Sequence, residues 1–319
     1  MNCIEPDANS TVTGLIWNLP AMARISIGIL QIFLNSAMLV AIVIYKELRT
    51  SFAVYLAFLF FLNVIYAASA YPLEIIRQGY WGRYWLPSSV CTVHMYLFWV
   101  MSAVPVHIHV LITLNRIWAM TFPVSYKNVH GEKVALLLCC IMTVYVHALC
   151  LPVVILDAMY YRLPEKENGC FLNTESQMVA TTIISIISCD VPIVVVVGAY
   201  PFLYYKQARR GKKLTASASR TGASTNVTNK VGQSPRSTRS SSLSHPFLVL
   251  TLLTVSVLIL WTPNQVTWTI GCVTAVGDMP GLWHTFSIFY LLQAVFDPIL
   301  FAFSLNRFRN LLANLICCK

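Results

Sequence analysis

The chain has 319 residues, of which 57% are hydrophobic and only 11% are charged, and its mean hydropathy is +0.66. Soluble domains carry about 25% charged residues, so a water-soluble fold, which could not cover its own surface with this composition, is excluded. The formal net charge of +10 comes mainly from segments predicted to face the cytoplasm. It therefore indicates contact with anionic lipid and not with nucleic acid.

Seven long intervals carry almost no formal charge, and each can cross the hydrocarbon core as a helix of about 20 residues. Membrane-spanning strands would be about half as long and would alternate polar and apolar residues, so helices are predicted. Asp190 and Asp297 are the only acids inside these intervals. The seven intervals are bounded by Arg24–Lys46, Arg49–Glu74, Arg83–Arg116, Lys133–Asp157, Glu175–Lys206, 240–277 and Asp278–Arg307. The predicted fold is an all-α membrane protein, a bundle of seven transmembrane helices.

Lysine and arginine are distributed unevenly about these spans. With the N-terminus outside, only five of the 22 lie on the outer side, namely Arg24, Arg77, Arg83, Arg162 and Lys166. The positive-inside rule therefore predicts a multi-pass protein of the plasma membrane with an extracellular N-terminus. We expect an outer tail over residues 1–21, a bundle over 22–305 and a cytoplasmic tail over 306–319.

The predicted outer side contains a glycosylation acceptor and four cysteines. Asn9 begins the acceptor sequence Asn-Ser-Thr in the outer tail. Cys91 and Cys170 fall in oxidising surroundings, where a disulfide between them would persist. Cys3 and Cys272 also lie outside and could pair, and the sequence does not by itself decide the connectivity.

Three segments outside the spans have distinct compositions. Residues 160–172 hold two short apolar runs around a polar stretch and predict a β-hairpin that covers the bundle. Residues 207–245 are rich in Ser, Thr, Gly, Lys and Arg, which predicts a disordered third cytoplasmic loop that serves either as a kinase target or as a solvated linker. Asn306–Ile316 predicts a short amphipathic eighth helix, and Cys317 and Cys318 behind it are candidates for palmitoylation.

Polar residues and prolines recur through the spans at fixed spacings. Cys91 lies 25 residues before Arg116. The positions are Asn35, Asn63, Asn115, Arg116, Pro123, Tyr126, Pro192, Tyr200, Trp261, Pro263, Asp297, Pro298, Phe301 and Phe308. Together they resemble the rhodopsin-like (class A) G-protein-coupled receptors. The sequence from Asn115 to Met120 is similar to that family's Asp-Arg-Tyr-Trp-Ala-Ile, the sequence around Trp261 to its Cys-Trp-x-Pro, and the sequence from Asp297 to Phe301 to its Asn-Pro-x-x-Tyr.

The resemblance implies a receptor that binds an extracellular ligand and activates a heterotrimeric G protein through Arg116. Trp261 and Pro263 would couple the ligand pocket to the cytoplasmic end, because a proline frees a helix to kink. Asn115 stands where the family has an acid, so the local ion pair with Arg116 cannot form. Phe301 lacks the hydroxyl that the family's tyrosine uses toward the counterpart of Tyr200. We therefore expect appreciable basal activity.

The acid of the second span and the amide of the seventh are exchanged relative to most of the family. Asn63 stands at the acidic position, and Asp297 stands at the asparagine position. We predict a direct contact between Asn63 and Asp297, with Asn35 close by. Pro105 replaces the hydroxyl of the family's sodium site, so sodium sensitivity should be weak or missing. His107 and His109 are interpreted as core residues and not as metal ligands.

The sequence narrows the ligand class mainly because residues typical of particular receptor classes are absent. Phe98 stands at the aspartate position of aminergic receptors, which disfavours a cationic monoamine. Leu291 stands at the retinal-bearing lysine position, which excludes an opsin. The candidate pocket has aromatic walls and few charges, and a small peptide is favoured. Its residues are Glu74, His94, Phe98, Ser102, Gln265, Trp268, Tyr290 and Gln293, with Asp190 as a weaker candidate.

No catalytic, cofactor-binding or metal-ligand spacing is found, so neither an enzyme nor a bound cofactor is expected. A signalling-silent receptor-like protein remains an alternative because the motifs are altered. A seven-helix transporter or channel subunit would need paired charges along its pathway, for which only Asp190 and Asp297 are candidates. The expected partners are an extracellular ligand, a G protein, membrane lipid, and arrestin and kinases at the third cytoplasmic loop.

Overall fold

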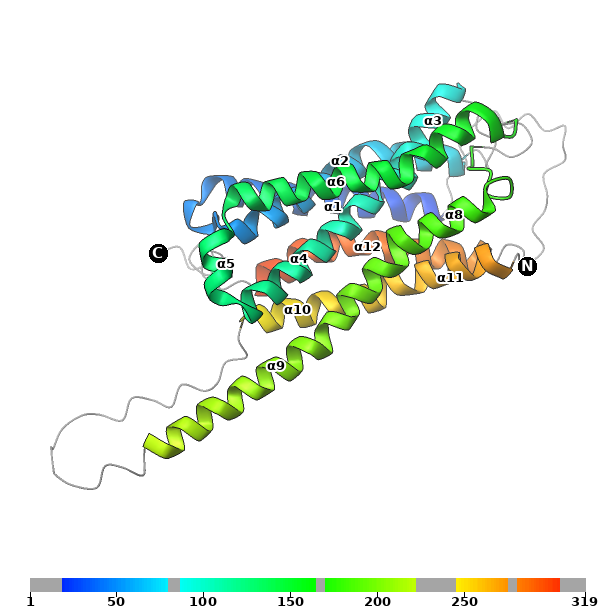
Figure 1. Ribbon diagram of the computed structural model, residues 1–319. Helices are drawn as coiled ribbons and strands as arrows, with labels where there is room; N and C mark the ends of the chain where they lie inside the picture. Colours follow the sequence, from blue (N-terminus) through cyan, green and yellow to red (C-terminus); the bar gives the residue numbers. More distant parts are fainter. Residues whose placement is uncertain (1–18, 80–86, 165–169, 222–244, 275–279, 305–319) are drawn as a thin grey trace, which may run out of the picture.

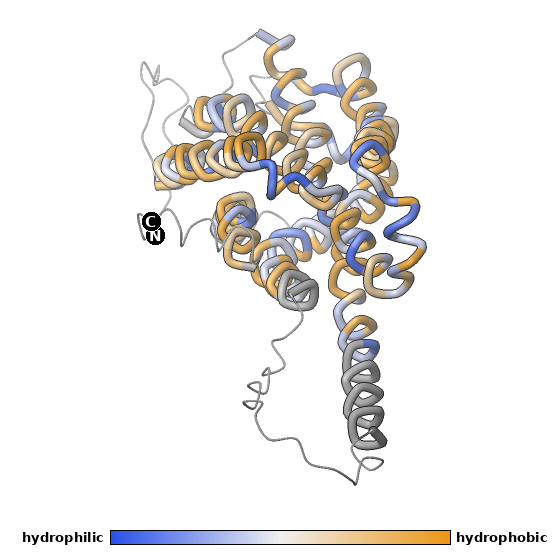
Figure 2. The backbone as a smooth tube through the Cα atoms, turned by 90° about the vertical axis from the view of Figure 1, so that its left-hand side faces the viewer, coloured by the Kyte–Doolittle hydropathy of each residue, from blue (hydrophilic) through white to orange (hydrophobic). Residues whose placement is uncertain are grey.

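The computed structural model describes residues 19–79, 87–164, 170–221, 245–274 and 280–304. Every regular element in these residues is a helix, and the helices run side by side in one bundle (Figure 1). Most turns of these helices contain hydrophobic residues (Figure 2). This arrangement confirms the predicted all-α membrane fold, in which each backbone group in lipid is satisfied within its own helix.

The described residues form seven helical rods, several of them with a π-helical turn. The first is α1 (Leu19–Ile44), joined to α2 (Ser51–Gly79) by the 3₁₀ turn η1 (Lys46–Leu48). The third comprises α3 (Ser88–Tyr96), η2 (Leu97–Met101) and α4 (Ala103–Thr121), followed by the short α5 (Pro123–Val129). The fourth comprises α6 (Glu132–Leu156) and η3 (Asp157–Tyr161), and the fifth comprises α8 (Met178–Ser185), η4 (Ile186–Asp190) and α9 (Val191–Thr221). The sixth comprises α10 (His245–Ser256), η5 (Val257–Trp261) and α11 (Thr262–Thr274), and the seventh is α12 (Pro280–Ser304).

Six of these rods are long and apolar enough among the described residues to cross a membrane. The remaining rod, α10–η5–α11, packs along α12 and carries the polar run Thr262-Pro263-Asn264-Gln265. We call the end of the bundle at α3 the α3 end and the opposite end, where α5 lies, the α5 end (Figure 1).

The interior of the bundle is mostly apolar but contains many buried polar side chains, and its outer surface is apolar. Phe33 and Val144 are 68% and 67% exposed on its surface, whereas Asn35 and His109 are fully buried. That pattern suits lipid as the surrounding solvent, because buried polar groups must then pair with one another. Helices α1 and α2 approach closely at Gly28, where an added Cβ would lie only 2.8 Å from a ring carbon of Tyr71.

Two predictions about connecting segments are wrong for the described residues. The first arm of the expected β-hairpin begins at Tyr160 and Tyr161, which instead belong to η3. The helix persists there because the Arg162 amide donates to the Asp157 carbonyl over 2.8 Å. Disorder was predicted from residue 207, yet α9 continues to Thr221, since Ala, Lys, Arg and Leu propagate a helix that the span has already nucleated.

Several predictions fall outside the described part of the chain. They concern the acceptor Asn9, the Cys3–Cys272 pair, the eighth helix, and the cysteines Cys317 and Cys318.

Candidate functional site

The disulfide and the segment after it fix the α3 end of the bundle. Cys91 at the start of α3 is bonded to Cys170, and the two Cα atoms lie 5.6 Å apart. Both cysteines are fully buried. The bridge ties the segment that precedes α8 to the third rod, as the resemblance implies.

A buried ion pair also holds this segment. The Arg162 Nε donates to Asp157 Oδ2 over 2.8 Å, and Arg162 Nη1 donates to the Thr92 hydroxyl over 2.7 Å. The other oxygen of Asp157 accepts the backbone N–H of Asn173 over 2.9 Å. Sequence reasoning missed this anchor. An acid and an arginine five residues apart at the end of a span were the available signal.

Charged side chains gather between α1, α2 and α3. Glu74, which is 7% exposed, accepts two hydrogen bonds from Arg77 over 2.6 and 2.8 Å. His94 Nε2 lies 3.2 Å from the same carboxylate, and Arg24 Nη2 lies 4.0 Å from it. Arg24 also donates to the Ser287 hydroxyl on α12. Two predicted pocket residues, Glu74 and His94, are thus brought together, but within a cluster of opposite charges.

An aromatic wall continues from this charged cluster. The Phe98 ring lies 6.2 Å from His94 and 6.1 Å from Trp99, measured between ring centroids. Trp99 meets Trp268 of α11 edge to face at 5.1 Å. Trp99 therefore links two predicted pocket residues, although it was not itself predicted to line the pocket.

A polar strip on α11 faces the fifth rod. Gln265 Nε2 donates to the Ser185 hydroxyl and to the Thr269 hydroxyl, each over 3.2 Å. The Thr269 hydroxyl donates in turn to the Asp190 carboxylate over 3.1 Å. Gln265 and the weaker candidate Asp190 therefore belong to one hydrogen-bonded set.

A small cavity lined by both polar and apolar residues lies in the middle of the bundle. It leaves about 30 Å³ for the centres of water molecules, which is room for about two waters. Among predicted pocket residues, Ser102, Tyr290 and Gln293 line it, and the Tyr290 hydroxyl donates to the Ser102 carbonyl over 3.2 Å. Other lining residues are Gln31, Asn63, Tyr71, Pro105, Trp261 and Asp297.

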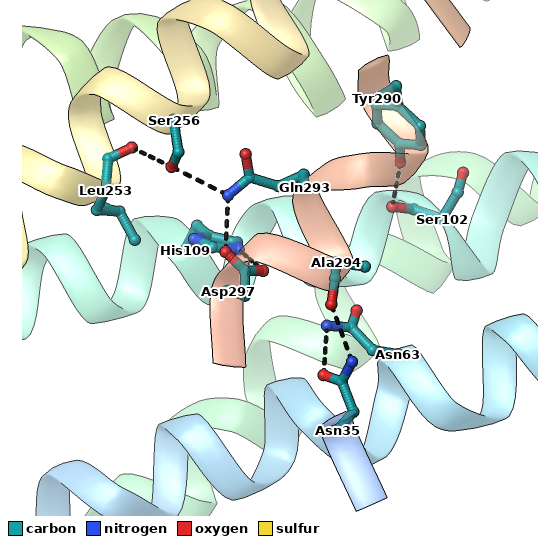
Figure 3. Close-up of polar contacts among 10 residues, drawn as sticks. All are labelled: Asn35, Asn63, Ser102, His109, Leu253, Ser256, Tyr290, Gln293, Ala294 and Asp297. Atoms are coloured by element: carbon teal, nitrogen blue, oxygen red, sulfur yellow. Dashed lines mark hydrogen bonds and ion pairs between the residues drawn. The ribbon is translucent and has the colours of Figure 1, made fainter. Parts of the chain in front are cut away.

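The two intramembrane asparagines form one unit beside this cavity (Figure 3). Asn63 Nδ2 donates to Asn35 Oδ1 over 3.1 Å. Asn35 Nδ2 donates to the Ala294 carbonyl of α12 over 2.9 Å and to the Gln31 carbonyl over 2.8 Å. This pair joins α1 and α2 to α12.

The predicted direct contact between Asn63 and Asp297 is wrong. Asp297 Oδ2 instead lies 3.0 Å from His109 Nε2, and Asp297 Oδ1 accepts a 2.7 Å hydrogen bond from Gln293 (Figure 3). Asp297 and His109 are 2% and 0% exposed. His109 of α4 and Gln293 of α12 thus contact the two carboxylate oxygens in place of Asn63. A buried intramembrane acid needs a partner, so a histidine in a neighbouring span was a signal that sequence reasoning did not use.

Trp261, Pro263 and Pro298 lie on the two rods beside this pair. The Trp261 ring meets His109 edge to face at 4.8 Å, at the last residue of the π-helical η5. Pro263 follows two residues later and lacks the N–H of a regular helix position. Pro298 follows Asp297 inside α12.

At the α5 end, Arg116 rests on an aromatic ring and not on an acid. Its guanidinium carbon lies 3.4 Å from the Phe52 ring centroid, and its Nε has no hydrogen-bond partner among the described residues. Phe301, 2% exposed, packs edge to face on Phe52 at 6.5 Å. Phe301, which replaces the family's tyrosine, therefore packs against the ring that contacts Arg116. Tyr200 stacks on Tyr204 at 6.4 Å in α9.

Asn115 is held by a neutral cluster. Asn115 Nδ2 lies 2.9 Å from His130 Nε2, and the Tyr126 hydroxyl donates to Asn115 Oδ1 over 3.2 Å. The Tyr55 hydroxyl lies 2.9 Å from the same His130 nitrogen. Burial lowers the pKa of His130, so its ring is neutral near pH 7 and Nε2 can accept. Sequence reasoning did not find His130, which lies between α5 and α6.

Two comparisons bear on this arrangement. Residues 34–301 match the family model described as 7 transmembrane receptor (rhodopsin family). The chain is also 24% identical over 296 residues to trace amine-associated receptor 365 of Petromyzon marinus, and that alignment covers 88% of this chain and 74% of the relative.

Proposed function

Because the chain belongs to the rhodopsin family of seven-transmembrane receptors, we propose that it binds an extracellular ligand and activates a heterotrimeric G protein. The observation that carries this proposal is Arg116, a half-buried cation at the α5 end that contacts a ring and no described acid. A cation so placed can meet the negative end of a helix dipole, such as the C-terminus of a G-protein helix. The proposed role is that of a receptor and not of an enzyme.

In this proposal the α3 end is extracellular and the α5 end faces the cytoplasm of the plasma membrane. The uneven distribution of Lys and Arg supports that orientation. We also propose that kinases and arrestin act on the loop within residues 207–245, because its hydroxyls stand beside basic residues.

A small peptide is the ligand class that we favour. The α3 end offers charges of both signs, since Arg24, Arg77 and Glu74 lie together there. The aromatic wall of Phe98, Trp99 and Trp268 lies next to them. A peptide with charged ends and apolar side chains complements such a surface.

A cationic amine is the second candidate, suggested by the relative's name. Phe98 occupies the position where aminergic receptors carry their aspartate, so an amine would need another carboxylate. Asp190 is a half-buried acid beside Thr269 in the polar strip. Asp190→Asn should abolish the response to an amine and leave the response to a peptide within about twofold.

The test is expression of the full chain with a panel of G-protein activation sensors. Basal signal and the signal evoked by tissue extracts are recorded before and after protease treatment of the extract, and loss after treatment identifies a peptide. Arg116→Ala should abolish the signal at unchanged surface expression. Arg49→Ala is the matched control, because Arg49 is an exposed arginine near the same end. Silence with every sensor and extract would refute the proposal in favour of a signalling-silent protein.

A further inference from the structure

The rhodopsin-like family implies a sodium ion in the middle of the bundle, and the residues of this chain do not fit one. Asn63 replaces the acid of the second rod, and Pro105 replaces the hydroxyl of the third. Among the described residues that line the cavity, Asp297 is the one carboxylate. Both of its oxygens already have partners within 3.0 Å. A cation would have to share this carboxylate with both partners, and the described lining residues offer no second carboxylate to help hold it.

We propose that the imidazole of His109 takes the place of that cation. It holds α12 to α4 through Asp297, and the resting state of the receptor consequently does not respond to sodium. His109 is a positioning residue in this proposal, since it acts by fixing Asp297 and not by touching a ligand or the G protein.

The hydrogen-bond inventory of the pair supports this role. In this proposal Asp297 is ionised and can only accept, so His109 Nε2 donates in the 3.0 Å contact between them. His109 Nδ1 has no hydrogen-bond partner among the described residues. The imidazole's polar contact is therefore with Asp297, and Gln293 satisfies the second oxygen. An isolated buried carboxylate would be strongly unfavourable, so the histidine removes the need for an ion.

The position of the pair connects it with the sixth rod, which contains a π-helical turn and a proline. His109 lies edge to face against Trp261, at the end of η5 and just before the proline of α11. Gln293 also donates to the Ser256 hydroxyl over 3.1 Å, and that hydroxyl donates to the Leu253 carbonyl of α10 over 2.8 Å (Figure 3). One polar set thus contacts the third, sixth and seventh rods. Any motion that separates α12 from α4 must break it.

The first test measures thermal unfolding of the purified full-length receptor in lipid nanodiscs. The midpoint is recorded in sodium chloride and in choline chloride at equal ionic strength. We expect equal midpoints for the unaltered protein. A sodium-specific rise of several degrees would overturn the proposal. This measurement does not depend on signalling.

The second test is a double-mutant cycle on the same readout. His109→Leu should lower the unfolding midpoint by roughly 4–8 °C, whereas His109→Gln, which keeps an N–H donor, should recover at least half of that loss. In the Asp297→Asn background, the loss caused by His109→Leu should fall to about half, because the hydrogen bond is no longer charge-assisted. Equal losses in both backgrounds would overturn the proposal.

His107 supplies the matched control. It is also buried in α4, but its Nδ1 lies 3.0 Å from the Ala103 carbonyl oxygen. His107→Leu should therefore show the same loss with and without Asp297→Asn.

The third test rests on the proposed function. His109→Leu should change basal G-protein signal severalfold, and His107→Leu should not. A thermal coupling between His109 and Asp297 without any signal from any variant would refute the proposed function and leave the helix contact standing. If His109→Leu does not fold, the sodium comparison and the His109→Gln variant still decide the inference. Failure of His109→Gln to fold as well would overturn it, because that variant keeps an N–H donor.

Discussion

Replacing Asn115 with aspartate tests how the α5 end is restrained. The amide of Asn115 contacts His130 Nε2 at 2.9 Å and accepts from the Tyr126 hydroxyl over 3.2 Å. A carboxylate there would accept from the Tyr126 hydroxyl and, once His130 is protonated at Nε2, from that ring as well. Hydrogen bonds to charged groups contribute about 1.5–3 kcal/mol and neutral ones about 1 kcal/mol. The net gain is about 1 kcal/mol, so basal activity should fall about fivefold in Asn115→Asp.

The pH dependence of this variant follows from the histidine. Burial lowers the pKa of His130 in the unaltered chain, and a carboxylate at position 115 would raise it. The added restraint is present while His130 is protonated and is lost as pH rises through the raised pKa. The fall in basal signal should therefore be larger at acidic than at alkaline cytosolic pH.

The assay is basal G-protein activation in cells whose cytosolic pH is clamped, normalised to surface expression. Asn115→Asp with His130→Phe is the control, because phenylalanine retains the stacking on Tyr126, which lies at a centroid distance of 4.6 Å, but cannot bond to the carboxylate. The pH dependence should disappear in that double variant. An unchanged or higher basal signal in Asn115→Asp, at every pH, would refute the reasoning.

Three further outcomes are expected. Cys170→Ala should abolish surface expression, because losing the bridge removes roughly 2–5 kcal/mol; normal expression with a free thiol found by mass spectrometry would contradict this. Gly28→Ala should lower the unfolding midpoint by several degrees, since its Cβ would lie 2.8 Å from a ring of α2, whereas Gly198→Ala, with nothing within 4 Å, should not. The double exchange Asn63→Asp with Asp297→Asn should recover little of the signal that Asn63→Asp loses, because the two side chains are not direct partners; recovery above half would show that they are.

The sequence predicted those features that depend on composition or on spacing along one chain segment. The charge-free intervals located the spans, and the cysteine at the start of the third rod pairs as the resemblance implies. Asn35 and Asn63 meet because each sits at mid-depth on helices joined by a short turn, η1.

Features that depend on how two distant helices are rotated could not be predicted in the same way. His109 and Asp297 are 188 residues apart, and Asn115 and His130 belong to a rod and a connecting segment. Hydrophobic patterning in a membrane says which residues avoid lipid, but not which buried polar groups face one another. The predicted hairpin was wrong because a hydrogen bond to Asp157, invisible in the alternation of apolar residues, favours a π-helical turn.

His130 and His109, whose contacts were not predicted, lie beside the two positions where the chain departs from the family's pattern. Where the third rod loses its acid at Asn115, His130 accepts from the replacement amide. Where the acid of the second rod moves to Asp297, His109 supplies the donor that the new position needs. An imidazole suits both places because it can donate or accept at the same nitrogen, depending on its partner. Each of the two departures is thus accompanied by an imidazole that contacts the replacing side chain directly.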